Sequence, residues 1–112
     1  MLQIEKSDDI AVVRFDDLTK LNALVAEDVK SQLTQEFEAP NTRMIISLDG
    51  VRFVDSTGFG AFLSVMKAAN NNHGELKICE ISDSVMELFK LLQLHNVFEI
   101  YNSVADAKKS FN

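Results

Sequence analysis

The segment Met44-Ile45-Ile46-Ser47-Leu48 constrains the fold more than any other part of the chain. It is an apolar run rich in β-branched side chains, and Asp49-Gly50 breaks it. Such a run is typical of a strand that other elements cover on both faces, whereas a strand with one face in water alternates polar and apolar residues. The segment therefore predicts a sheet with packing partners on both of its faces.

Helical periodicity recurs on either side of this strand. After residue 23, apolar residues return every four positions until Pro40, which closes the helix. A second helix follows residue 56 and ends in the polar turn at residues 70–74, and a third follows Ser82. A short terminal helix over residues 103–111 begins with Ser103 as its cap. The three longer helices have apolar faces formed by Val25, Val29, Leu33 and Phe37, by Phe59, Phe62, Leu63 and Met66, and by Val85, Leu88, Phe89 and Leu92.

Strand patterns alternate with these helices along the chain. Residues 2–6 and 10–15 flank the turn residues Ser7-Asp8-Asp9 and predict a hairpin at one edge, while residues 16–22 read as polar and irregular. Further strands are expected at 75–79 and 97–101, and residues 51–54 form a short apolar segment. The alternation predicts one α/β domain over residues 1–112, with about four helices and a mixed, mostly parallel sheet of four to five strands.

The charge and cysteine content narrow the possible functions. The chain has 11 Lys and Arg and 17 Asp and Glu, which gives a formal charge of −6. Binding to nucleic acids or to anionic membranes requires clustered basic residues, so the charge argues against both functions.

Cys79 is the single cysteine, so no disulfide framework or Cys-x-x-Cys pair is possible, and its apolar surroundings favour a packing role. The two histidines stand far apart without ligand spacing, which argues against a metal site. The N-terminal residues lack a signal-peptide pattern, so the cytoplasm is the expected location.

The candidate functional segment is Val54-Asp55-Ser56-Thr57-Gly58-Phe59-Gly60, between an apolar segment and a helix. In α/β sheets functional groups gather beyond the carboxyl ends of strands, where helix N-termini point outward. Asp55 or Ser56 could instead serve only as an N-cap, which contributes about 1 kcal/mol. No Lys follows the glycines as a phosphate-binding loop requires, and neither histidine can be placed beside Ser56 as a base. Enzymatic catalysis is therefore the weaker hypothesis.

The segment from Asp49 to Gly60, preceded by its apolar strand, resembles the signature of STAS domains, and specifically that of bacterial anti-sigma factor antagonists. The resemblance spans nearly the whole chain. It implies that Ser56 is phosphorylated by a GHKL-type serine kinase that is also the anti-sigma factor, and that a PP2C-type phosphatase removes the phosphate. It further implies a docking surface to which Asp55, Thr57, Gly58, Phe59 and Gly60 contribute. ATP would be bound by the kinase, so no cofactor is expected on this chain.

One departure from the family pattern lies at Thr19-Lys20-Leu21-Asn22-Ala23. Family members commonly have Gly-x-Leu/Ile-Asp here, with the acid helping to dock the kinase, whereas this chain has Asn22 and no glycine. Asn22 could also cap the following helix, and Phe59 could be either core or an exposed anchor. Two other functions stay open: a scaffold or regulatory subunit of a stressosome or lipid-transport complex with Ser56 only a cap, and a small-ligand or nucleotide binder with an anion site at the N–H groups of residues 57–60.

Overall fold

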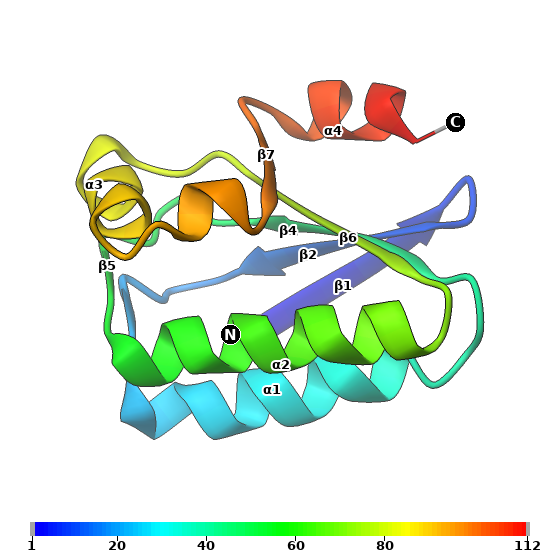
Figure 1. Cartoon of the computed structure of the whole chain (residues 1–112), viewed down its shortest axis with the longest axis horizontal. Coiled ribbons are helices and arrows are strands. Elements are labelled where there is room, and N and C mark those ends of the chain that lie inside the picture. Colours follow the sequence, from blue (N-terminus) through cyan, green and yellow to red (C-terminus); the bar gives the residue numbers. More distant parts are fainter. Residues whose placement is uncertain (1, 112) are drawn as a thin grey trace.

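Five strands form the main sheet of the computed structural model, which describes residues 2–111 (Figure 1). Their order is β1–β2–β4–β6–β7; β1 and β2 pair antiparallel, and the other neighbours pair parallel. The predicted mixed, mostly parallel sheet with an edge hairpin is thus confirmed. The strands are β1 (Leu2–Ser7), β2 (Ile10–Phe15), β4 (Arg43–Ser47), β6 (Glu75–Cys79) and β7 (Glu99–Tyr101).

The hairpin turn between β1 and β2 contains only two residues. Ser7 pairs with Ile10, and Asp8 and Asp9 between them have φ values of 53° and 63°. Two successive left-handed residues match the right-handed twist of the flanking strands, and Asp tolerates this region better than most residues. The predicted turn is therefore confirmed at Asp8 and Asp9, whereas Ser7, which was also expected in the turn, is the last residue of β1.

Helices cover both faces of the sheet, as the apolar β4 run requires (Figure 1). Helices α1 and α2 lie side by side on one face, α4 lies on the other, and α3 with the short 3₁₀ helix η1 lies beyond the end of β6. The predicted four helices are confirmed. Their bounds are α1 (Ala23–Glu36), α2 (Ser56–Asn71), α3 (Asp83–Leu91), η1 (Leu94–Asn96) and α4 (Val104–Ser110).

The larger hydrophobic core lies between the sheet and helices α1, α2 and α3. Phe37, Phe62 and Phe89 are among its fully buried side chains. The Phe89 ring packs edge-on against Phe59 and Phe98, with ring centroids 5.0 Å and 6.1 Å apart. Edge-to-face contacts place the positive edge of one ring against the negative face of another. These contacts tie the first turn of α2 to α3.

A smaller core lies under α4, and a buried cation lies against it. This core joins β2, β4 and β6 to α4 and includes Cys79, whose predicted packing role is confirmed. The Lys77 side chain is only 3% exposed. Its Nζ lies 3.1 Å from Glu99 Oε1 and 4.5 Å from the centroid of the Phe111 ring. A carboxylate and an aromatic face thus replace the water that the ammonium loses on burial.

The structure corrects three expectations. Residues 16–22 are not entirely irregular, because they include a two-residue strand, β3 (Lys20–Leu21), which pairs parallel with β5 (Phe53–Val54). The strand expected at 97–101 begins only at Glu99, since η1 and the residues after it occupy the preceding positions. Leu92 does not belong to the buried face of α3: it is the C-cap residue and is 50% exposed.

None of the helices among residues 2–111 is both long enough and apolar enough to span a lipid bilayer.

Candidate functional site

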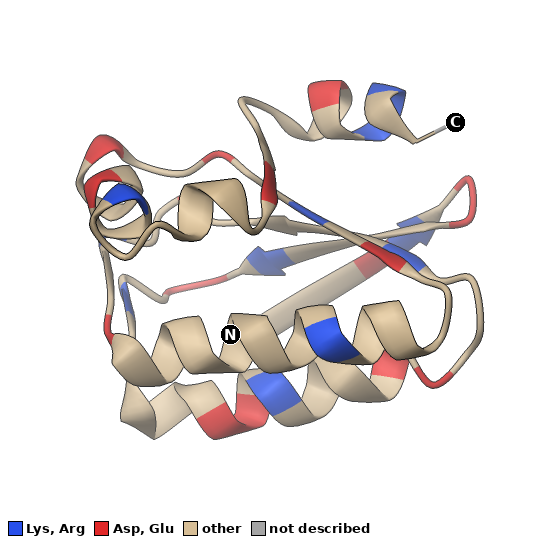
Figure 2. Cartoon of the chain, in the orientation of Figure 1, with Lys and Arg blue, Asp and Glu red and all other residues tan. Residues whose placement is uncertain are grey.

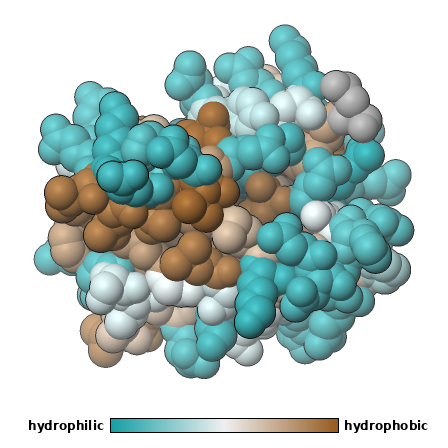
Figure 3. Space-filling view, in the orientation of Figure 1, coloured by the Kyte–Doolittle hydropathy of each residue, from teal (hydrophilic) through white to brown (hydrophobic). Residues whose placement is uncertain are grey.

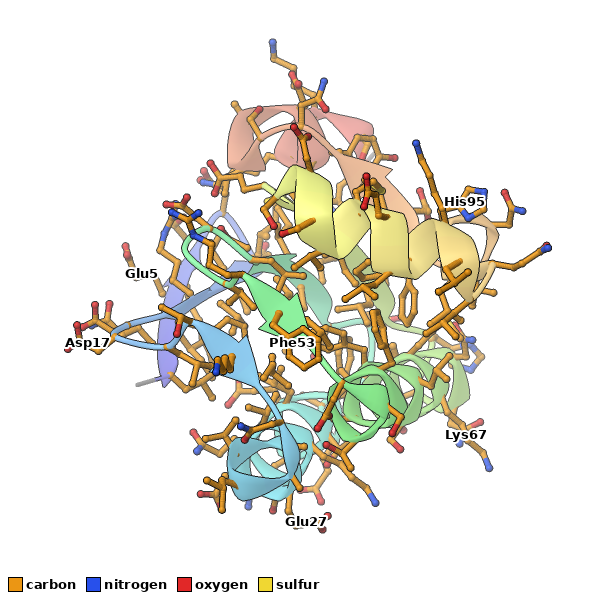
Figure 4. All side chains as sticks on the ribbon, turned by 90° about the vertical axis from the view of Figure 1, so that its left-hand side faces the viewer. Glu5, Asp17, Glu27, Phe53, Lys67 and His95 are labelled. Atoms are coloured by element: carbon orange, nitrogen blue, oxygen red, sulfur yellow. The ribbon has the colours of Figure 1, made fainter. Side chains whose placement is uncertain are left out.

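The pairing of β3 with β5 brings two distant segments together at one end of the molecule. Leu21 lies opposite Val54 in this parallel ladder, and the next residue in each chain segment is the N-cap of a helix. Asn22 caps α1 and Asp55 caps α2, so the two helices start side by side (Figure 4). The ladder therefore places Asn22 next to the candidate segment.

Asn22 has the capping role that its sequence position allowed. Its Oδ1 accepts a hydrogen bond of 3.1 Å from the backbone N–H of Leu24, and its carbonyl accepts from Val25 and Ala26. Asparagine is among the best N-cap residues because its short side chain reaches the orphan donors of the first turn. An aspartate at position 22 could make the same hydrogen bond. The capping role therefore explains why a short side chain stands at this position, but it does not explain why the chain has the uncharged Asn22 instead of an aspartate.

Asp55 caps α2 through a single carboxylate oxygen. Its Oδ1 accepts from the backbone N–H groups of Thr57 and Gly58 at 2.9 Å and 3.1 Å, and from the Thr57 hydroxyl at 2.5 Å. The Thr57 hydroxyl lowers the pKa of Asp55 most, followed by the N–H group of Gly58. Burial acts in the opposite direction, and the N–H groups of Thr57 and Ala23 lower the pKa further. Asp55 is therefore ionised at neutral pH. The choice between Asp55 and Ser56 as the cap is settled in favour of Asp55.

This cap also argues against an anion site at residues 57–60. The N–H groups of Thr57 and Gly58 already donate to the Asp55 side chain, and that of Phe59 donates to the Asp55 carbonyl at 3.1 Å. A helix N-terminus binds an anion through unpartnered N–H groups. Here the carboxylate of Asp55 occupies the position that such an anion would take.

Ser56 is the first residue of α2, and its side chain is exposed. Because Asp55 provides the cap, the Ser56 hydroxyl has no part in it. The interpretation of Ser56 as only a helix cap is therefore wrong. Its hydroxyl is presented to solvent at the positive end of a 16-residue helix, which carries roughly half an elementary charge.

Gly58 and Phe59 are structural residues rather than surface residues. A Cβ atom at Gly58 would lie 2.6 Å from the Leu21 carbonyl oxygen and 2.7 Å from Val54 Cγ1. Phe59 is 4% exposed and packs on Phe89, so the alternative of an exposed Phe59 anchor is wrong. Of the predicted docking residues, Thr57 and Gly60 are exposed, Asn22 and Asp55 are partly buried, and Gly58 and Phe59 are buried.

Two exposed apolar side chains flank the site, and the sequence alone did not single them out. Leu24 lies in the first turn of α1 and is 89% exposed, and Phe53, two residues before Asp55, is 45% exposed. Figure 4 views this end directly, with Phe53 near its centre. Their only sequence signal is an apolar residue two positions from a helix cap. Together with Ser56, they form the surface that is called the Ser56 face below.

A groove and a further apolar patch extend from the Ser56 face. The groove, of about 350 Å³, lies between α1 and α2. The patch lies over α2, α3 and η1 (Figure 3). Charges of both signs occur on α1, whereas α2 carries one charged residue, Lys67 (Figure 2). The groove is lined by Ala23, Ala26, Glu27, Lys30, Thr57, Gly60, Ala61 and Ser64, and the patch contains Leu63, Leu91, Leu92 and Val97.

A further hollow, of about 890 Å³, is open, and none of the predicted site residues lines it. It lies around the β1–β2 turn and the segment that joins α1 to β4, and side chains of both signs line it. Among residues 2–111, no three His, Cys, Asp or Glu side chains come together as a metal site.

The model of one protein family, described as the STAS domain, matches residues 1–107. The chain belongs to the STAS family. Among curated relatives, the anti-sigma-B factor antagonist of Staphylococcus aureus is 28% identical over 81 residues, which cover 72% of this chain and 75% of the relative. The resemblance that residues 49–60 carried is thereby confirmed for the family.

Solved structures confirm the predicted fold of this STAS domain. An anti-sigma-factor antagonist (STAS) domain protein from Planctomyces limnophilus superposes with a TM-score of 0.85 at 18% identity, covering 95% of this chain and 92% of the other. The phosphorylated form of the Bacillus cell fate determinant SpoIIAA superposes with a TM-score of 0.74 at 18% identity and covers the full length of both chains. At such identities, the likeness is one of fold.

Proposed function

We propose that this STAS domain is an anti-sigma factor antagonist that phosphorylation of Ser56 switches off. The unphosphorylated form binds a GHKL-type anti-sigma factor serine kinase, and a PP2C-type phosphatase restores it. The observation that carries this proposal is the exposed Ser56 hydroxyl, which stands outside the cap at the start of α2. The name of the S. aureus relative and the existence of a phosphorylated SpoIIAA of the same fold support it.

The position of Ser56 lets the fold accept a phosphate. The group adds about −1.5 to −2 charges and three acceptor oxygens. At a helix N-terminus the macrodipole favours a negative charge by roughly 0.3–1 kcal/mol, which opposes the repulsion from the neighbouring Asp55 carboxylate. Ser56 is exposed, so the phosphate also keeps its hydration. The switch then acts at the interface with the kinase and leaves the fold in place.

The Ser56 face offers what a protein partner needs around such a switch. Leu24 and Phe53 supply exposed apolar area at the same end of the molecule as Ser56, and an interface with an apolar centre and a polar rim is typical of protein complexes. A phosphate on Ser56 would have to lose water when such an interface forms. A loss of about 3 kcal/mol corresponds to roughly a hundredfold in affinity, enough for a switch.

The test combines labelling and binding with the GHKL-type kinase encoded in the same genome. With radiolabelled ATP, we expect label on the wild-type chain and labelling of Ser56→Ala that is at least about tenfold slower. In calorimetric titrations, Ser56→Asp is expected to weaken binding at least about tenfold while the circular dichroism stays unchanged, because Asp also suits a helix start. Ser31→Asp is the matched control, since it adds the same charge at an exposed serine of α1.

Two results would contradict the proposal. Equal labelling of Ser56→Ala would remove Ser56 as the phosphorylation site. Unchanged affinity of Ser56→Asp, with Ser31→Asp behaving identically, would show that a charge at this helix start does not control docking.

A further inference from the structure

We propose that Asp55 restricts phosphorylation to Ser56 by withholding the adjacent hydroxyl of Thr57. This inference rests on the proposed function, because it concerns the choice of acceptor at the same site. Ser56 and Thr57 are both exposed residues of the first turn of α2. Exposure and position along the helix therefore do not distinguish them for a kinase, and another feature must do so.

The hydrogen bonds around Asp55 separate the two hydroxyls. The Thr57 hydroxyl donates to Asp55 Oδ1 at 2.5 Å, and the same oxygen accepts the backbone N–H groups of Thr57 and Gly58. The carboxylate cannot turn away from Thr57 without giving up the N-cap of α2. The Thr57 side chain is thus held in the orientation that points its oxygen back at Asp55, whereas the Ser56 hydroxyl takes no part in this arrangement.

The chemistry of phosphoryl transfer makes this contact costly at Thr57. In the transfer, the bond between the hydroxyl oxygen and the γ-phosphorus forms as the bond from that phosphorus to the bridging oxygen of ATP breaks. ADP leaves, and the hydroxyl proton passes to a base on the kinase. At Thr57 the hydroxyl would first have to leave Asp55, and the product would place a phosphate dianion against an ionised carboxylate. The Thr57 hydroxyl, which donates a hydrogen bond to Asp55, would be replaced by a phosphate with the same sign of charge as the Asp55 carboxylate. Both the reaction and its product are therefore disfavoured at Thr57.

The first experiment uses the same kinase with ATP and maps the phosphorylated residue by mass spectrometry. We expect Ser56 alone to be modified in the wild type, and Thr57 in Ser56→Ala to react at least about tenfold more slowly than Ser56 does in the wild type. In the double variant Ser56→Ala/Asp55→Gly, phosphorylation of Thr57 is expected to appear. Glycine is a suitable replacement because at an N-cap it costs only a few tenths of a kcal/mol relative to Asp.

A matched control separates release of Thr57 from general loosening of the helix starts. Ser56→Ala/Asn22→Gly removes the neighbouring cap of α1 but leaves the contact between Asp55 and Thr57 in place. We expect this variant to remain unmodified at Thr57. Rapid modification of Thr57 in Ser56→Ala, or equal behaviour of the two double variants, would overturn the inference.

The second experiment needs no kinase. Chains carrying phosphoserine at position 56 or phosphothreonine at position 57, introduced by codon expansion, are unfolded in urea. We expect a lower midpoint for the phosphothreonine chain than for the phosphoserine chain, and recovery of that difference in the Asp55→Gly background. Equal midpoints would overturn the inference. Absence of any label on wild-type Ser56 in the first experiment would instead contradict the proposed function.

Discussion

Two glycines in the first turns of α2 offer a matched pair of substitutions. An added Cβ at Gly58 would lie 2.6 Å from the Leu21 carbonyl oxygen, 2.7 Å from Val54 Cγ1 and 2.8 Å from Leu21 Cδ2. An added Cβ at Gly60 would meet no atom within 4 Å apart from the adjoining residues of its own helix. The same change, Gly→Ala, two residues apart in one helix, therefore meets opposite environments.

The magnitudes follow from the two environments. Alanine is favoured over glycine in a helix interior by about 0.8–1.0 kcal/mol, and this gain is common to both variants. Overpacking costs roughly 1–3 kcal/mol, and at Gly58 part of the obstacle is backbone held by the Asp55 N–H at 3.2 Å. Gly60→Ala is thus expected to stabilise the domain by roughly 0.5–1 kcal/mol. Gly58→Ala is expected to be less stable than Gly60→Ala by about 1–3 kcal/mol.

Urea unfolding, followed by circular dichroism at the helix band, measures both free energies directly. For a domain of this size, the difference corresponds to roughly 4–12 °C between the two melting temperatures. Stabilities of the two variants within about 0.5 kcal/mol of each other would refute the reasoning, because the contact of Gly58 with β3 would then carry no energy.

Three further predictions concern titratable and buried groups. The hydrogen bond from the Thr57 hydroxyl lowers the folded-state pKa of Asp55 below the ordinary value for aspartate, so the contribution of Asp55 to stability is present above about pH 4 and is lost as the pH falls through the folded pKa. Thr57→Val should raise this pKa, as measured by carboxyl ¹³C NMR, and an unchanged value would contradict the assignment. Burial raises the pKa of Cys79 to about 11, so at pH 8 roughly 0.1% is thiolate and a thiol reagent should label the chain only in urea; rapid labelling of the folded chain would disprove this. Lys77→Met should change the free energy of unfolding by less than about 1 kcal/mol or raise it, whereas Glu99→Ala should lower it by about 1–3 kcal/mol because it leaves a buried cation unpaired. Urea titrations measure both free energies. A larger loss of stability for Lys77→Met than for Glu99→Ala would contradict this reasoning.

Local patterns were sufficient to predict most of the architecture. The periodicities of α1 and α2, the turn signal at Asp8-Asp9, the helix start after Ser82 and the cap at Ser103 all depend on a few neighbouring residues. Each is found where its pattern indicates. The candidate segment was also found from local signals, since an Asp-Ser-Thr-Gly run after an apolar segment marks a helix start.

The features that sequence reasoning missed depend on contacts between distant segments. Strand β3 has two residues and no pattern of its own, and it exists because it pairs with Phe53–Val54. Whether Asp55 or Ser56 caps α2 depends on backbone geometry at one residue, which composition does not reveal. The burial of Lys77 requires Glu99 and Phe111, 22 and 34 positions away, and a lone lysine in a strand gives no sign of them.

The ladder between β3 and β5 also limits how the length of homologous chains can vary. One residue inserted between Leu21 and Asn22 would turn the start of α1 by about 100° and carry Val29 and Leu33 away from the core. A change in length before Lys20 would fall in the exposed segment that follows β2. Only the last residues of that segment join the ladder, so such a change would leave the starts of α1 and α2 in place. Insertions that preserve the fold are therefore expected ahead of β3 and absent from the two short junctions that follow the ladder. In an alignment, these junctions would stand out as blocks without gaps even where the residues themselves differ.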